Sequence, residues 1–137
     1  MATAIPLTLN LLILIGLYEL AVGLAGLTRR IDWVPILDEF DRSPAMSFMA
    51  GFAAFAVGAA IHLSHHHWTD LPAIIVTGLA WIALVEGLLI MIMPALLLEF
   101  SRRIASYQRT VSVGATLFGA ILILLGVTGR VDPTAVI

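Results

Sequence analysis

The chain has 137 residues, of which 61% are hydrophobic and 12% charged, and its formal net charge is -2 at pH 7. This length predicts a single domain, residues 1–137, and the apolar fraction exceeds what a soluble domain can bury. All seven basic residues are arginines, too few to form the positive field of a nucleic-acid-binding protein. The absence of cysteine excludes disulfides, thiolate nucleophiles and Cys-ligated metal centres.

Four apolar runs are long enough to cross a bilayer, which takes about 20 helical residues. Inside hydrocarbon each backbone polar group must be satisfied within its own segment, so the runs favour helix over strand. No basic residue precedes the long first run, which we therefore interpret as a retained span and not as a secretion signal. The third run is overlong, so we expect it to bend at Pro94 and finish along the membrane surface. The sequence predicts an all-α membrane protein, a four-transmembrane-helix bundle with spans at 5–27, 45–63, 71–98 and 111–128.

The arginines indicate how the chain is oriented, because short loops rich in basic residues stay in the cytoplasm. Only Arg130 lies on one side of the predicted membrane. We therefore expect both termini and the loop between the second and third spans to face outward. The other six arginines flank the two loops expected in the cytoplasm: Arg29, Arg30, Arg42, Arg102, Arg103 and Arg109.

A short segment after the first span has apolar residues at helical spacing. Trp33, Ile36, Leu37 and Phe40 fall on one face, and acidic residues fall on the others. This pattern predicts an amphipathic helix at the membrane surface. A docking motif for a soluble partner is the alternative.

The two halves of the chain, about 1–68 and 69–137, resemble one helical hairpin written twice. Each half places a glutamate inside its first span, Glu19 or Glu86, followed by an arginine pair and a small-residue helix. The halves run in the same direction, so the pattern predicts a parallel repeat with its axis along the membrane normal.

The second half carries a family resemblance. It has Val85-Glu86-Gly87-Leu88-Leu89, then Pro94, Arg102-Arg103 and a Gly-rich last span. Over about residues 78–128 this arrangement resembles the small uncharacterised bacterial inner-membrane proteins of the YjeT type; the first half resembles them more faintly and lacks the proline. The resemblance implies a bacterial inner-membrane location and no known activity.

Glu19 and Glu86 are the leading candidates for a functional site, because a carboxylate inside the membrane is energetically costly. If both faced the bundle interior, they would share a proton or bind a cation, as in a proton-coupled carrier. Their nearest expected hydrogen-bond partners are Tyr18, Ser112 and Thr116. The alternative is that each glutamate is a protonated clasp that fixes helix packing or a subunit contact.

Small residues at helical spacing predict close helix packing. They indicate a tight interior lined by Gly16, Gly23, Gly26, Gly51, Gly58, Gly119 and Gly126.

The predicted outer loop contains a histidine cluster. If the second helix continues outward, His62 and His66 share a face that can present two imidazoles to zinc or copper, with His65, His67 and Asp70 nearby. Solvation at the lipid headgroups and pH sensing are the alternatives. We expect no resident cofactor, with such a metal ion as the exception.

No nucleophile with a base and an orienting group can be assembled, so we expect no enzyme. The sequence favours an accessory or structural subunit that packs against other membrane subunits or another copy of itself in the bilayer. A small proton-coupled transporter or channel is the first alternative, and an outward-facing metal-binding protein is the second.

Overall fold

The computed structural model describes residues 2–3, 6–28 and 31–131. Four long helices are joined by two shorter ones, and a two-residue strand lies beyond each end of the helical part. The elements are β1 (Ala2–Thr3), α1 (Pro6–Leu27), α2 (Trp33–Arg42), α3 (Pro44–Ser64), α4 (Leu71–Ile92), α5 (Pro94–Ala105), α6 (Gln108–Thr128) and β2 (Arg130–Val131).

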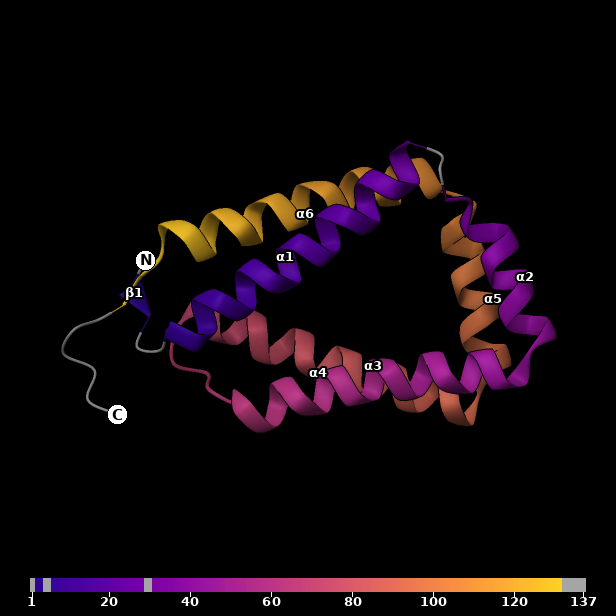
Figure 1. Cartoon of the computed structure of the whole chain (residues 1–137), viewed down its shortest axis with the longest axis horizontal. Coiled ribbons are helices and arrows are strands. Elements are labelled where there is room, and N and C mark those ends of the chain that lie inside the picture. Colours follow the sequence, from indigo (N-terminus) through magenta and orange to yellow (C-terminus); the bar gives the residue numbers. More distant parts are fainter. Residues whose placement is uncertain (1, 4–5, 29–30, 132–137) are drawn as a thin grey trace.

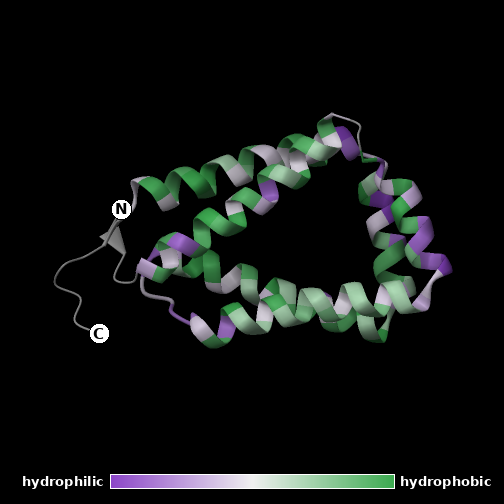
Figure 2. Cartoon of the chain, viewed as in Figure 1, coloured by the Kyte–Doolittle hydropathy of each residue, from purple (hydrophilic) through white to green (hydrophobic). Residues whose placement is uncertain are grey.

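The four long helices are long and apolar enough to cross a membrane, and they lie close to the predicted spans. Only 17% to 28% of the most apolar window of each helix is buried inside the chain. Hydrophobic residues cover most of the long helices, whereas hydrophilic residues gather on α2, on α5 and near the loop between α3 and α4 (Figure 2). Most of the apolar surface therefore faces away from the chain's own core.

The predicted bend at Pro94 is confirmed. Helix α4 ends at Ile92, Met93 has non-helical dihedral angles (φ -135°, ψ 61°), and α5 begins at Pro94. Proline ends a helix because its nitrogen donates no hydrogen bond and its ring disfavours a helical conformation in the preceding residue. As a result, α5 lies across the ends of the long helices beside α2 (Figure 1).

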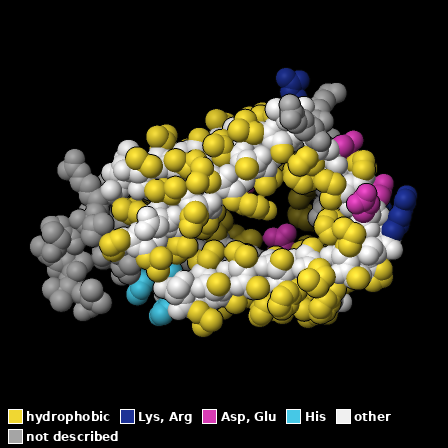
Figure 3. Space-filling view, in the orientation of Figure 1, with side chains coloured by type: hydrophobic (Ala, Val, Ile, Leu, Met, Phe, Trp, Pro, Cys, Tyr) yellow, Lys and Arg dark blue, Asp and Glu magenta, His cyan; other side chains and the backbone are white. Residues whose placement is uncertain are grey.

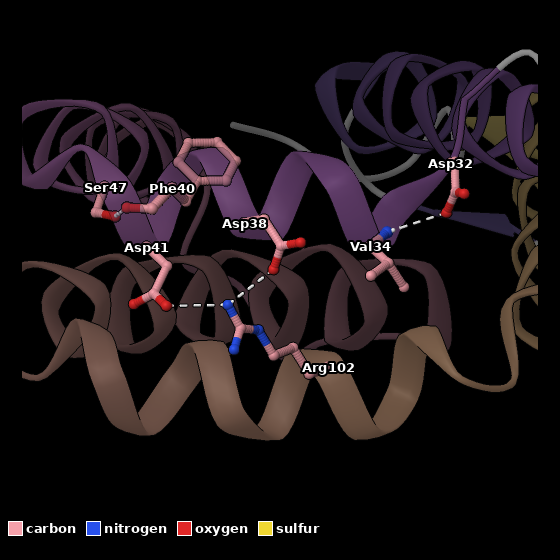
Figure 4. Close-up of polar contacts among 7 residues, drawn as sticks. All are labelled: Asp32, Val34, Asp38, Phe40, Asp41, Ser47 and Arg102. Carbon is pink, nitrogen blue, oxygen red and sulfur yellow. Dashed lines mark hydrogen bonds and ion pairs between the residues drawn. The ribbon is translucent and has the colours of Figure 1, made fainter.

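Residues 33–42 form a helix, α2, as the spacing predicts. The Asp32 side chain caps this helix by accepting a hydrogen bond from the Val34 N–H (3.2 Å). Arg102 of α5 lies 3.0 Å from both Asp38 and Asp41, which binds α5 to α2 (Figure 4). The position of α2 at a membrane surface stays a prediction.

The long helices pack as two antiparallel pairs, α1 with α6 and α3 with α4, and not as one compact bundle. The pairs meet at one end and diverge towards the other, where α2 and α5 complete a triangular frame (Figure 1). Each long helix therefore packs mainly on a helix from the other half of the chain, which differs from two self-contained hairpins. Glycines of both helices contact each other in each of these two pairs.

We call the end where the pairs meet the apex, and the α2 and α5 end the base. At the apex, Leu12 of α1, Val76 of α4 and Leu122 of α6 form a fully buried apolar cluster. Strands β1 and β2 pair in parallel beside this end (Figure 1). The two ends of the described chain thus lie on the same side of the frame.

Candidate functional site

The α1–α6 contact is built on glycines. A methyl group added at Gly119 would lie 2.6 Å from the Gly16 carbonyl oxygen, and one at Gly126 would lie 2.9 Å from the Leu9 carbonyl oxygen. Gly23 and Gly26 face the first turns of α6, at Thr116 and Ser112. These distances leave no room for a side chain, so the two backbones touch directly.

The α3–α4 contact repeats this arrangement. A methyl group at Gly51 would lie 2.9 Å from the Gly87 carbonyl oxygen, and one at Gly58 would lie 2.8 Å from the Ala80 carbonyl oxygen. Gly87 was not among the glycines predicted to pack helices, although its added methyl would meet the backbone of Gly51 and Phe55. The predicted packing glycines therefore lie in two separate helix pairs and do not line one shared interior.

Glu19 belongs to the α1–α6 pair. It lies three residues after Gly16 and four before Gly23, both of which face α6, so helical spacing places it on the edge of that contact. It is partly buried. Within the described part of the chain it has no hydrogen bond or ion pair, which leaves a carboxylate without a partner inside a predicted span.

Glu86 has a different environment, next to the Pro94 bend. It is exposed and lines a cleft of about 530 Å³ between α4 and α5. It also lines a hollow of about 120 Å³ that α2 and α3 help to enclose. No described residue forms a hydrogen bond or ion pair with it.

The structure does not bring the two carboxylates together. They lie on different helix pairs, and α1 approaches α4 mainly at the apex (Figure 1). The buried apex residues Leu12 and Val76 lie about two helical turns before Glu19 and about three before Glu86. The expected partners also lie elsewhere: Thr116 donates to the Ser112 carbonyl (2.8 Å), Ser112 packs on Gly26, and Tyr18 is 67% exposed. A proton shared within one chain is not supported by this arrangement.

His65 is the one member of the histidine cluster that is fully buried. Its Nε2 atom lies 2.7 Å from the Thr8 hydroxyl of α1, and its Nδ1 atom lies 3.2 Å from the Thr77 hydroxyl of α4. The Thr77 hydroxyl donates to the His67 carbonyl (2.8 Å), so it accepts from the Nδ1–H of His65. His65 therefore joins the two helix pairs at the apex through both of its ring nitrogens.

Burial of His65 lowers its pKa below the ordinary value of 6.5, and the neighbouring charge of His67 lowers it further. A backbone hydrogen bond and Asp70 act in the opposite direction. The role of His65 was not predicted, because the sequence shows four histidines in one loop and does not reveal which one is buried.

The remaining histidines lie at the end of α3 and in the loop that follows it. Helix α3 ends at Ser64, so His62 and His66 do not share a helix face, and their ring centroids are 6.2 Å apart. Asp70 caps α4 by accepting from the Ala73 N–H (2.9 Å). No group of three or more potential ligands converges within the described part of the chain.

Comparisons with protein-family models, curated proteins and solved structures found no match to this chain.

Proposed function

We propose that this chain is a non-catalytic accessory or structural subunit of a membrane complex, in which another helix, from a partner or a second copy, occupies the opening of the frame. The observation that carries the proposal is the divergence of the two helix pairs. The space-filling view shows this opening as a hollow surrounded by apolar side chains, with an acidic side chain inside (Figure 3).

Membrane helices associate through close packing and interhelical hydrogen bonds, because lipid tails are as apolar as the helices themselves. In this chain, the glycines of the long helices make their close contacts within each pair. Among the described residues, the two pairs contact each other mainly through α1 and α4 at the apex (Figure 1). Glu19 favours a protein over lipid tails as the neighbour, since an intramembrane carboxylate normally pairs with a polar group. The chain supplies no such group in its described part.

The location and orientation belong to the same proposal. We place the protein in the inner membrane of a bacterium, in line with the YjeT-type resemblance, with the base in the cytoplasm and the apex outside. Helices α2 and α5 carry arginines at the base, and short arginine-rich loops stay cytoplasmic. A transporter remains the first alternative, but its paired carboxylates would have to come from two copies.

The test is to extract the full-length chain from its native membrane in a mild detergent and weigh the intact particles by native mass spectrometry. We expect a defined complex with a second polypeptide or a second copy. Glu19→Gln should lower the recovery of that complex severalfold, whereas Glu39→Gln, on the exposed face of α2, should not. A chain that is monomeric with lipid alone would contradict the proposal.

A further inference from the structure

The cleft between α4 and α5 combines an apolar lining with one carboxylate. It is formed by apolar side chains and two aromatic rings, Trp81 and Phe100, and its only polar side chains are Glu86 and Ser101. Its volume of about 530 Å³ lies within the range of roughly 300–1,000 Å³ typical of small-molecule sites. The smaller hollow shares Glu86 and Ser101 with the cleft, so the carboxylate borders both spaces.

The cleft follows from the Pro94 bend. Because α4 stops at Ile92 and α5 turns across the base, side chains of the last turns of α4 face those of α5 across an angle and do not pack along one helix. Val85, Phe100 and Trp81 are each at least 47% exposed. The cleft is therefore accessible from the surroundings of the chain.

The described arginines near the cleft pair with carboxylates other than Glu86. Arg102 is engaged by Asp38 and Asp41, and Arg103 lies 2.7 Å from Glu99. Among the described residues no arginine lines the cleft, and Glu86 is the one ionisable group in its lining. A carboxylate in apolar surroundings is stabilised by a positive charge at contact distance, and a second anion would be repelled.

We propose that this cleft binds a lipophilic organic cation, a positive ammonium- or phosphonium-type centre carried on apolar groups. Glu86 contacts the charge, the Trp81 and Phe100 rings attract the cation through their faces, and the apolar lining holds its substituents. The site lies within one chain and does not depend on the proposed subunit role. The cation-binding proposal and the subunit proposal can therefore be refuted independently.

The test is equilibrium dialysis of the full-length chain in a neutral maltoside detergent, with empty micelles as the blank. Two probes of the same shape and opposite charge are compared, tetraphenylphosphonium and tetraphenylborate. We expect saturable binding of the cation only. Glu86→Gln should weaken this binding about tenfold, a change equivalent to about 1.4 kcal/mol. Glu39→Gln, which changes an exposed carboxylate of α2 that does not line the cleft, should leave it unchanged.

A second variant keeps the proposal testable if Glu86→Gln misfolds. Leu97→Trp keeps the carboxylate but fills the space beside it, and it should also reduce binding of the cation. Both variants must elute as wild type does on gel filtration. Equal binding of the two probes, or full cation binding by Glu86→Gln, would overturn the proposal.

A further competition experiment distinguishes a lipid ammonium from a non-lipid organic cation as the natural occupant. Phosphatidylethanolamine, whose headgroup carries an ammonium, is added as a competitor, with diacylglycerol as the uncharged control. Competition by the first lipid alone identifies a lipid ammonium as a natural occupant. If neither lipid competes, this lipid ammonium does not occupy the cleft. Both results presuppose the saturable cation binding described above.

Discussion

The apex and the base of the frame hold the same two helix pairs by different physical means. At the apex, Leu12, Val76 and Leu122 pack with no exposed surface, and His65 connects α1 to α4 through two buried hydrogen bonds. At the base, α2 and α5 are joined by exposed ion pairs from Arg102 and have no buried residue.

This difference indicates which part of the chain determines how the two helix pairs are arranged. Buried apolar contacts and satisfied buried hydrogen bonds contribute more free energy than exposed ion pairs, which are worth about 0–1 kcal/mol. The apex should therefore determine how the pairs are joined, and the base should limit how far they spread. Substitutions at the two ends test this comparison.

The largest loss of stability is expected from a substitution in the α1–α6 contact, because this pair extends from the apex to the base (Figure 1). Gly119→Leu places a side chain against the backbone of Leu20 and Gly16, and should destabilise the fold by about 3 kcal/mol or more. Unfolding in sodium dodecyl sulfate, followed by circular dichroism, measures this change. Gly114→Leu on the same helix is the control, because an added methyl there meets nothing within 4 Å. Equal effects of the two substitutions would contradict the packing.

At the apex, His65→Ala removes both buried hydrogen bonds and leaves the Thr8 and Thr77 hydroxyls without this partner. We expect a loss of about 1–3 kcal/mol in the same unfolding measurement. The exposed His66 is the matched control, and His66→Ala should change stability by less than about 0.5 kcal/mol. If His65→Ala left the stability unchanged, the apex would depend on apolar packing alone.

The apex should also respond to pH. The folded pKa of His65 is lowered, so the unfolded chain takes up a proton near pH 6.5 while the folded chain does not. The stabilisation from this group is complete above pH 6.5 and declines as the pH falls from there towards the lowered folded pKa. Unfolding midpoints between pH 8 and pH 5, compared with those of His65→Ala, measure it. The same pH dependence in both proteins would assign it to another group.

The smallest effect is expected at the base. Arg102→Gln removes the ion pairs to Asp38 and Asp41, which are about half exposed, and should lower stability by no more than about 1 kcal/mol. Arg103→Gln is the control, since Arg103 pairs only with Glu99 within α5. A loss above 3 kcal/mol for Arg102→Gln alone would reverse the ranking of the two ends.

Much of the local structure could be predicted from the sequence. The Pro94 bend follows from the missing N–H of proline, and the α2 helix follows from the spacing of Trp33 and Phe40. The glycines indicate close packing but not the partner, because stripes of small residues on different helices are alike. Periodicity therefore identified the packing faces without revealing that α1 packs on α6.

The candidate site was predicted less completely, because its geometry depends on contacts between distant residues. Glu19 and Glu86 were identified by their cost in a membrane, but their separation depends on the divergence of the pairs. His65 bonds to Thr8 at a sequence separation of 57 residues, and nothing near either residue indicates this contact. The cleft at Glu86 arises only once the bend has placed Phe100 opposite α4.

The most direct test of the open frame is a pair of distances measured by electron spin resonance in lipid nanodiscs. The chain has no cysteine, so spin labels can be attached at two introduced cysteines without a background. One pair, at Leu7 and Leu63, reports on the apex, and the other, at Leu24 and Phe48, reports on the base; all four side chains are exposed. We expect a short distance at the apex and a clearly longer one at the base. Equally short distances at both ends would contradict the open frame and indicate a compact four-helix bundle.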